Sequence, residues 1–170
     1  MKITEDLHGS LVRALGGDVL QHSSLRQKPL SIDLALPLPP RLRVYMYKLV
    51  VGGPRRAGEY KVLLRVPGQV RGEYGSFDHS EDRFALVMGY DPDLDVFVLW
   101  DASLHARFKW AGNIQVRAPT VYTAAAMGHA REVRPLTSGL TEVVIACRSA
   151  ELPQTIDDRV LWTGDNTVRP

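Results

Sequence analysis

The feature that most constrains the fold is a series of short segments in which apolar and polar residues alternate. In residues 42–50, LRVYMYKLV, the residues Leu, Val and Met alternate with Arg and Tyr. Successive side chains of a strand point to opposite faces of a sheet, so this alternation predicts a strand with two distinct faces. The nearly all-apolar segment 142–147 predicts an interior strand. Further strands are predicted at 60–66, 84–90, 96–100 and 113–117.

Three segments show helical patterns instead. Residues 4–16 carry an apolar stripe, with Thr4 as the N-cap and Gly16 as the stop. Residues 119–128 begin with proline and end with glycine, and residues 149–161 form a closing helix. About six short strands with two or three flanking helices predict an α+β domain built on a strongly curved sheet or a small β-barrel.

A length of 170 residues fits one domain with short appendages. We expect an N-terminal helix and an irregular, proline-rich lead-in over 1–40, a curved-sheet domain over 41–162, and a tail or linker over 163–170. No apolar run reaches the roughly 18 residues of a membrane span. The single cysteine, Cys147, excludes an internal disulfide, so we expect a reducing, cytoplasmic setting.

Charge is segregated along the chain, although the formal net charge is only +2. Segments 41–74 and 105–117 are basic, and the segment between them, 78–101, is acidic. Segregation of this kind can create a basic surface that suits a polyanion, unless the strands interleave in space and the signs mix. The residues expected to bind DNA phosphates are Arg43, Lys48, Arg55, Arg56, Lys61, Arg65, Arg71, Arg107, Lys109 and Arg117.

Aromatic residues alternate with these bases, most clearly in residues 106–117, ARFKWAGNIQVR. Lysine and arginine neutralise phosphates, and the planes of Tyr, Phe and Trp can stack on nucleobases. Asn113 and Gln115 share one face of a strand, where their amides can contact base edges or a phosphate. The alternative is that the aromatic residues belong to the core and the bases only solubilise the surface.

One pattern points to catalysis instead of binding. Glu59 and Lys61 form a Glu-x-Lys pair, and Asp33 is the upstream acid at a plausible spacing. In a magnesium-dependent nuclease two such acids hold the metal ion while the lysine steadies the attacking water. Glu-x-Lys is also common on solvated strand faces. The histidines are scattered, and neither a nucleophile elbow nor a phosphate-binding glycine loop occurs, so no catalytic residue, metal ion or cofactor is predicted.

Four stretches together carry a family resemblance: RVYMYKLVVGGPRRAGEYKVLLRVPGQ, FALVMGYDPDLDVFVLWDASLH, FKWAGNIQV and TEVVIACRSAELPQTI. Over about 41–156 the chain resembles the modification-reading, SRA-like domain of bacterial McrA-type HNH restriction endonucleases. The resemblance implies a PUA-like curved sheet that grips duplex DNA and can flip a modified base, typically a methylated cytosine, into a pocket. No HNH-type histidine cluster follows, so the nuclease would be a separate domain or chain.

A base pocket needs stacking planes and a group that reads the Watson–Crick edge. Asp101 could accept from a cytosine amino group, although it could equally cap the turn DASLH. The candidate base-reading residues are Tyr90, Trp100, Asp101, Phe108, Trp110, Asn113 and Gln115.

The sequence therefore predicts a non-catalytic module of a restriction system that reads modified, methylated-cytosine duplex DNA and acts with a nuclease domain or chain. It predicts no cofactor and no membrane partner. The alternatives are a magnesium-dependent nuclease using Asp33, Glu59 and Lys61, and a protein-interaction domain using the Asp-rich face.

Overall fold

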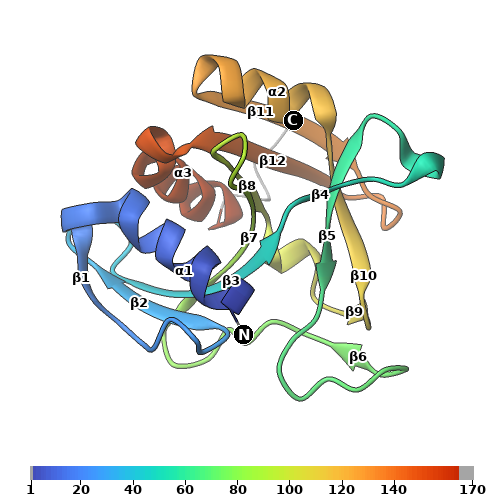
Figure 1. The fold of residues 1–170 in the computed structure, drawn as a ribbon. Helices are drawn as coiled ribbons and strands as arrows, with labels where there is room; N and C mark the ends of the chain where they lie inside the picture. Colours follow the sequence, from blue (N-terminus) through green and yellow to red (C-terminus); the bar gives the residue numbers. More distant parts are fainter. Residues whose placement is uncertain (1, 165–170) are drawn as a thin grey trace.

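The computed structural model describes residues 2–164, which form a mixed α+β fold with one large sheet, two small sheets and three α-helices (Figure 1). Within this range the sheets do not close into a barrel. The seven-stranded sheet has the order β1-β2-β3-β7-β8-β12-β11. Only its β3–β7 pair is parallel among the described strands. Its strands are β1 (Val19–His22), β2 (Leu30–Leu34), β3 (Arg41–Lys48), β7 (Phe84–Asp91), β8 (Val96–Trp100), β11 (His129–Pro135) and β12 (Thr141–Arg148).

Two small sheets and three α-helices lie outside the large sheet. The three-stranded sheet contains β10 (Gly112–Arg117), β5 (Glu59–Leu64) and β4 (Val50–Val51), and the two-stranded sheet pairs β6 (Tyr74–Gly75) with β9 (Phe108–Lys109). The helices are α1 (Lys2–Leu15), α2 (Ala118–Met127) and α3 (Leu152–Gly164). Short 3₁₀-helices cover Gly16–Asp18, Pro54–Arg56, Ala102–Leu104 and Ser149–Glu151. No described helix has the length and apolar content needed to cross a membrane.

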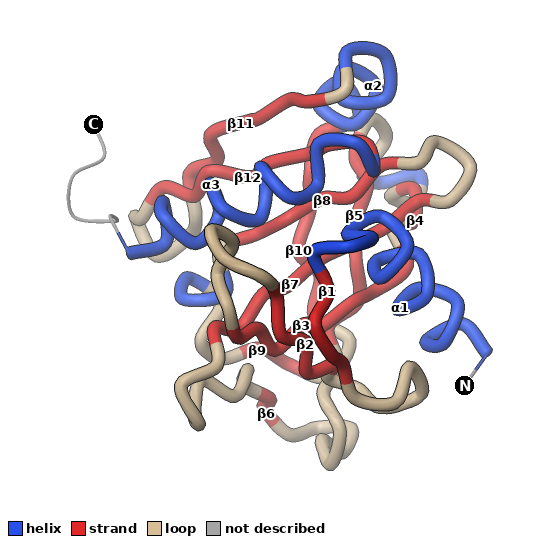
Figure 2. Tube along the Cα trace, turned by 90° about the vertical axis from the view of Figure 1, so that its left-hand side faces the viewer, coloured by secondary structure: helices blue, strands red, loops and turns tan. Residues whose placement is uncertain are grey.

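Strand β3 shows why the large sheet is buried on both sides. Leu42 and Val44 pack into a core with α1 and α3, whereas Tyr45 and Tyr47 pack into a second core with the three-stranded sheet and α2. Figure 2, which faces α1 and α3, shows both helices lying across the front of the strands. The alternation predicted for this segment is confirmed, and each of its faces is covered by its own layer.

Gly89 of β7 lets the three-stranded sheet approach the large one. A Cβ atom there would lie 2.8 Å from Cγ1 of Val62, 3.2 Å from Leu49 and 3.3 Å from Trp100. Any larger residue would push β5 away, because interiors are close-packed. The position of β5, and of everything attached to its end, therefore depends on this close contact.

The helices at 4–16, 119–128 and 149–161 are confirmed with small shifts, as are the six strands predicted from 42 onward. Strands β1 and β11 of the large sheet and the short strands β4, β6 and β9 were not predicted, and residues 19–22 and 30–34 of the supposed lead-in belong to the large sheet. The helix α3 runs to Gly164, so 163 and 164 are helical. The rest of the predicted tail lies outside the described residues.

Candidate nucleic-acid interface

The outer face of the three-stranded sheet brings two predicted segments together. In the β10–β5 pairing, Gln115 lies opposite Lys61 and Asn113 lies opposite Leu63. Their neighbours Ile114 and Val62 point inward and are buried. Because side chains alternate along a strand, the amides and Lys61 all lie on the same, outward face. The structure thus places both amide candidates beside a lysine that comes from a distant part of the sequence.

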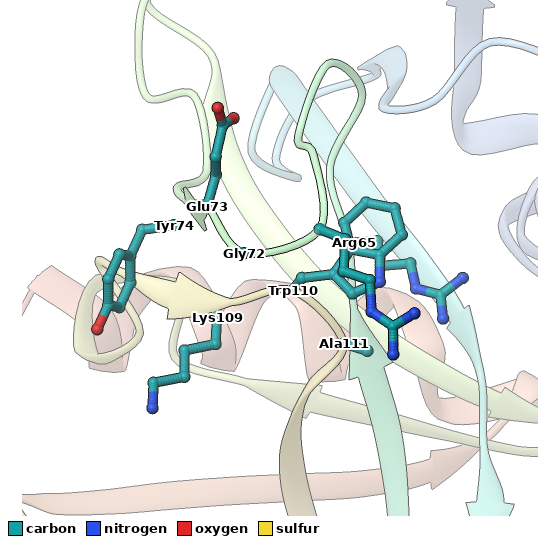
Figure 3. Close-up of a pocket in the computed structure, with 8 residues that line it drawn as sticks. Arg65, Gly72, Glu73, Tyr74, Lys109, Trp110 and Ala111 are labelled. Carbon is teal, nitrogen blue, oxygen red and sulfur yellow. The ribbon is translucent and has the colours of Figure 1, made fainter.

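A hollow of about 740 Å³ opens beyond the end of β5 (Figure 3). We call it the basic groove, and it is lined by Arg65, Arg71, Gly72, Glu73, Tyr74, Lys109, Trp110 and Ala111. Figure 3 shows Arg65 and Trp110 on one side and Tyr74 and Lys109 on the other, with the carboxylate of Glu73 pointing away from Lys109. Within residues 2–164, Arg65, Arg71 and Lys109 form no ion pair with a carboxylate. The groove therefore presents cations that are available to a ligand.

Two arginine–aromatic contacts shape this surface. The guanidinium carbon of Arg65 lies 4.8 Å from the ring centroid of Trp110, and that of Arg107 lies 3.7 Å from the ring centroid of Tyr74. Such contacts hold the guanidinium group in a fixed orientation without neutralising its charge. The Tyr74 side chain is 52% exposed. A cation and a flat aromatic surface are consequently presented together at two places.

Gln69 holds the wall of the groove in place. Its Oε1 accepts from the backbone N–H of Val66 at 3.2 Å, and its Nε2 donates to the carbonyls of Glu73 at 3.2 Å and Phe108 at 3.4 Å. These bonds tie the loop after β5 to strand β9, so the loop has a defined shape. Neither Gln69 nor Tyr74 was among the predicted site residues. A local pattern does not identify them, because Gln69 reaches Phe108, 39 residues along the chain, and Tyr74 stacks against Arg107 of the same distant segment.

A second hollow, of about 400 Å³, borders β10 and has Asn113, Gln115, Arg107 and Arg134 among its lining residues. His105 also lines it, and its Nε2 lies 2.8 Å from Oε2 of Glu142. We call this hollow the amide pocket. The two predicted amides thus lie at a concave site, next to the basic groove rather than inside it.

Asp101 belongs to a buried cluster behind the amide pocket. The side chain is 0% exposed, and its carboxylate accepts from the backbone N–H of Ser103 at 3.0 Å and from the Ser103 hydroxyl. Its other oxygen lies 3.6 Å from Nη2 of Arg159, and its own N–H donates to Glu142 at 2.9 Å. We call the buried residues Asp101, Glu142 and Arg159, together with the partly buried His105 and the exposed Ser103 that bond to them, the buried polar cluster. Asp101 therefore caps the turn 102–104, which is the structural role that the sequence left open.

The structure does not bring the other aromatic candidates to the basic groove. Trp100 is 1% exposed, and its indole N–H donates to the carbonyl of Gln115 at 2.9 Å. Tyr90 stacks on Phe97 at 4.2 Å on the side of the sheet that α1 covers, and Phe108 packs against core residues. Of the predicted aromatic residues only Trp110 lines the groove.

The predicted phosphate-binding residues divide in the same way. Arg65, Arg71 and Lys109 line the basic groove, Arg107 adjoins it, and Lys61 lies on the outer sheet face. The remaining residues lie elsewhere: Arg43 is buried and paired with Asp78 and Glu81, Lys48 lies beside α1, Arg55 and Arg56 border a separate hollow near Glu59, and Arg117 is 3.9 Å from Glu132.

The residues of the alternative nuclease do not come together. Asp33 is on β2 in the large sheet, where its pKa is lowered by hydrogen bonds from Gln21 and Arg83. Glu59 is on β5 in the small sheet and pairs with Arg134 at 3.5 Å and Arg56 at 3.6 Å. In the part of the chain that the structure describes, no group of three His, Cys, Asp or Glu side chains is arranged to hold a metal ion.

One known family matches most of the chain. Residues 40–156 match the family described as Methylase-associated X1, or MTaX1, and the chain belongs to this family. The description suggests a role connected with DNA modification systems. No curated protein and no solved structure is detectably similar to the chain.

Proposed function

We propose that this chain is a non-catalytic, DNA-binding module of a DNA modification and restriction system. The observation that carries the proposal is the basic groove, which Arg65, Arg71 and Lys109 line together with Trp110 and in which these three cations have no carboxylate partner within residues 2–164. Cations of this kind bind phosphates by releasing condensed counterions from DNA, and an adjacent ring gives a base a surface for stacking.

The outer face of the three-stranded sheet extends this interface. Lys61 adds a charge, and Asn113 and Gln115 add hydrogen-bond donors and acceptors beside it. Phosphate contacts fix the position of a protein on the duplex, whereas amides can read base edges. We assign the positioning of DNA to the basic groove and the reading of bases to the amide pocket.

The ligand in this proposal is duplex DNA that carries a modified base, and methylated cytosine is the first candidate. Membership in a methylase-associated family supports a modified ligand. The resemblance to SRA-like domains of McrA-type endonucleases adds two proposals: that the curved sheet is a PUA-like fold that grips duplex DNA, and that it flips the modified base. A nuclease in another domain or chain is the proposed partner.

A gel-shift panel tests this function. The probes are one duplex sequence in unmodified, methylcytosine, hydroxymethylcytosine, methyladenine and phosphorothioate forms, each with and without Mg²⁺. We expect binding that weakens steeply with salt and is tightest for one modified probe. Equal affinity for all probes would remove the reading of modifications but leave DNA binding, and no binding at low salt would remove both. Cleavage with Mg²⁺ would contradict a non-catalytic role.

A further inference from the structure

Lys28, which the sequence did not single out, does not line the basic groove, but it lies close enough to Arg65 of the groove for the two charges to interact. It belongs to the segment between β1 and β2, and its Nζ lies 3.7 Å from the ring centroid of Tyr47 on β3. The Tyr47 hydroxyl in turn donates to the backbone carbonyl of Arg65 at 2.8 Å. Lys28 is thus connected, through one buried aromatic ring, to the residue that begins the groove.

The charges around Lys28 are not balanced. In the described portion of the chain, no carboxylate forms an ion pair with Lys28 or Arg65. Burial, and then the positive charge of Arg65, lower the pKa of Lys28 to about 8. The nearby His8 is also a base, and burial lowers its pKa, with a smaller contribution from Lys28. The partly buried ammonium of Lys28 and the exposed guanidinium of Arg65 repel each other unless an anion lies between or beside them.

The surroundings indicate which anion would fit. Lysine offers a compact point charge, and arginine offers a planar set of donors that matches a phosphate or carboxylate. Arg65 also lies against the Trp110 ring, so the anion would be next to an aromatic surface. A phosphate attached to a nucleoside satisfies both conditions, because the phosphate meets the cations while a base can stack on the ring.

We propose that Lys28 and Arg65 form a phosphate-binding subsite beside the basic groove, on the side where Tyr47 joins them. This subsite depends on the proposed function for one point only, namely that a DNA backbone is the expected source of the phosphate. A free phosphate group would use the same chemistry, and the experiment separates these two sources.

The first arm of the test uses duplex DNA. Lys28→Met removes the charge but keeps an unbranched side chain over Tyr47, whereas Lys28→Arg keeps the charge. We expect Lys28→Met to weaken binding about fivefold and to reduce the slope of log K against log salt by about 0.9, the value for one phosphate contact. Lys28→Arg should retain the wild-type slope. Lys48→Met is the matched control, because Lys48 is exposed beside α1, and it should leave affinity and slope unchanged.

The second arm uses inorganic phosphate without DNA. The titration of Lys28 is followed by NMR of the lysine side chains, with and without phosphate. A bound anion favours the ammonium form, so we expect phosphate to raise the pKa of Lys28 by about one pH unit. Arg65→Gln should abolish this response, and Lys48 should not respond.

The two arms distinguish failure of the subsite from failure of the proposed function. If the wild-type protein binds no DNA but phosphate raises the pKa of Lys28, the subsite stands and the DNA-binding function falls. If DNA binds normally to Lys28→Met and phosphate leaves the pKa of Lys28 unchanged, the subsite is overturned and DNA binding stands. Circular dichroism of each variant checks that it is folded.

Discussion

The basic groove and the buried polar cluster use similar residues for different purposes. In the cluster, Asp101 is enclosed by Ser103 and Arg159, and Glu142 accepts from His105 and from a backbone N–H. In the groove, Arg65 and its basic neighbours contact aromatic rings instead of carboxylates. Both regions adjoin the segment that leads from β8 to β10. Proximity in sequence therefore did not determine which charges were available to a ligand.

The cost of desolvation explains the difference. A charge removed from water must be paired and hydrogen-bonded, so the members of the cluster are committed to one another. A charge at the surface has little desolvation cost and can remain available for a ligand. The presence or absence of an internal partner, rather than residue type, thus separates structural charges from binding charges in this fold.

Removing a charge from the buried polar cluster should give the largest effect on stability. Asp101→Asn leaves the shape of the side chain nearly unchanged but deprives Arg159 of a buried counter-charge. We expect the free energy of unfolding to fall by about 3–5 kcal/mol, measured by urea denaturation. The folded fraction should bind DNA with wild-type affinity. Weaker binding with unchanged stability would instead place Asp101 in the DNA interface.

Removing the Trp110 ring from the groove should weaken DNA binding and leave stability nearly unchanged. Trp110→Ala should weaken DNA binding by about 1–3 kcal/mol, the range for loss of a base-stacking surface, with little change in melting temperature. Trp162→Ala is the matched control, because Arg131 lies 5.5 Å from the Trp162 ring in a comparable contact on α3. DNA titrations followed by fluorescence anisotropy measure both variants. An equal loss of DNA affinity in Trp110→Ala and Trp162→Ala would contradict the assignment of DNA binding to the basic groove.

A pair of arginines sharpens the comparison further. Arg65 is exposed in the groove, whereas Arg43 is 5% exposed and holds Glu81 at 2.9 Å together with the carbonyls of Asp78 and Ser80. Arg43→Gln should lower the free energy of unfolding by about 1.5–3 kcal/mol and leave DNA affinity unchanged. Arg65→Gln should do the reverse and reduce the salt dependence of binding. Urea denaturation and salt titrations of DNA binding are measured for both variants. Equal losses of stability and of DNA affinity in the two would contradict the distinction between a structural arginine and a binding arginine.

Much of the fold could be predicted because its signals are local. The strands from 42 onward alternate or are wholly apolar, and the helices have recognisable ends. Strand β11 escaped prediction because its pattern is inverted: Val133 is 56% exposed, whereas Glu132 faces inward and pairs with Arg134 at 3.2 Å. A charged inward face is stable only with such partners, and these are formed by tertiary contacts that the sequence does not display.

The candidate site was less predictable for a related reason. Trp110, Arg65 and Lys109 could be selected from composition, but their separation from Trp100 and Asp101 depends on which strand faces which layer. Lys28 was missed because it lies in a segment that the sequence placed outside the sheet domain, while its contact with Tyr47 is long-range. Side-chain chemistry is thus visible in the sequence, whereas the pairing of charges is a property of the fold.

The smallest expected effect tests the cost of Lys28, an unpaired and partly buried cation beside the groove. The pKa of Lys28 is about 8 in the folded protein and 10.5 in the unfolded chain. Between these two pH values the unfolded chain therefore binds more protons than the folded protein does. The free energy of unfolding contributed by this group therefore rises with pH across that window, and the full penalty of the charged lysine is present below pH 8. Lys28→Met removes the penalty and should stabilise the protein by about 1 kcal/mol at pH 7, after allowance for partial solvent exposure. This gain should disappear by pH 10.5, which urea denaturation at pH 7 and pH 10.5 would measure.

Lys48→Met is the control and should give no comparable gain in stability. A destabilised Lys28→Met at pH 7 would mean that the lysine has a structural partner, as the charges of the buried polar cluster do.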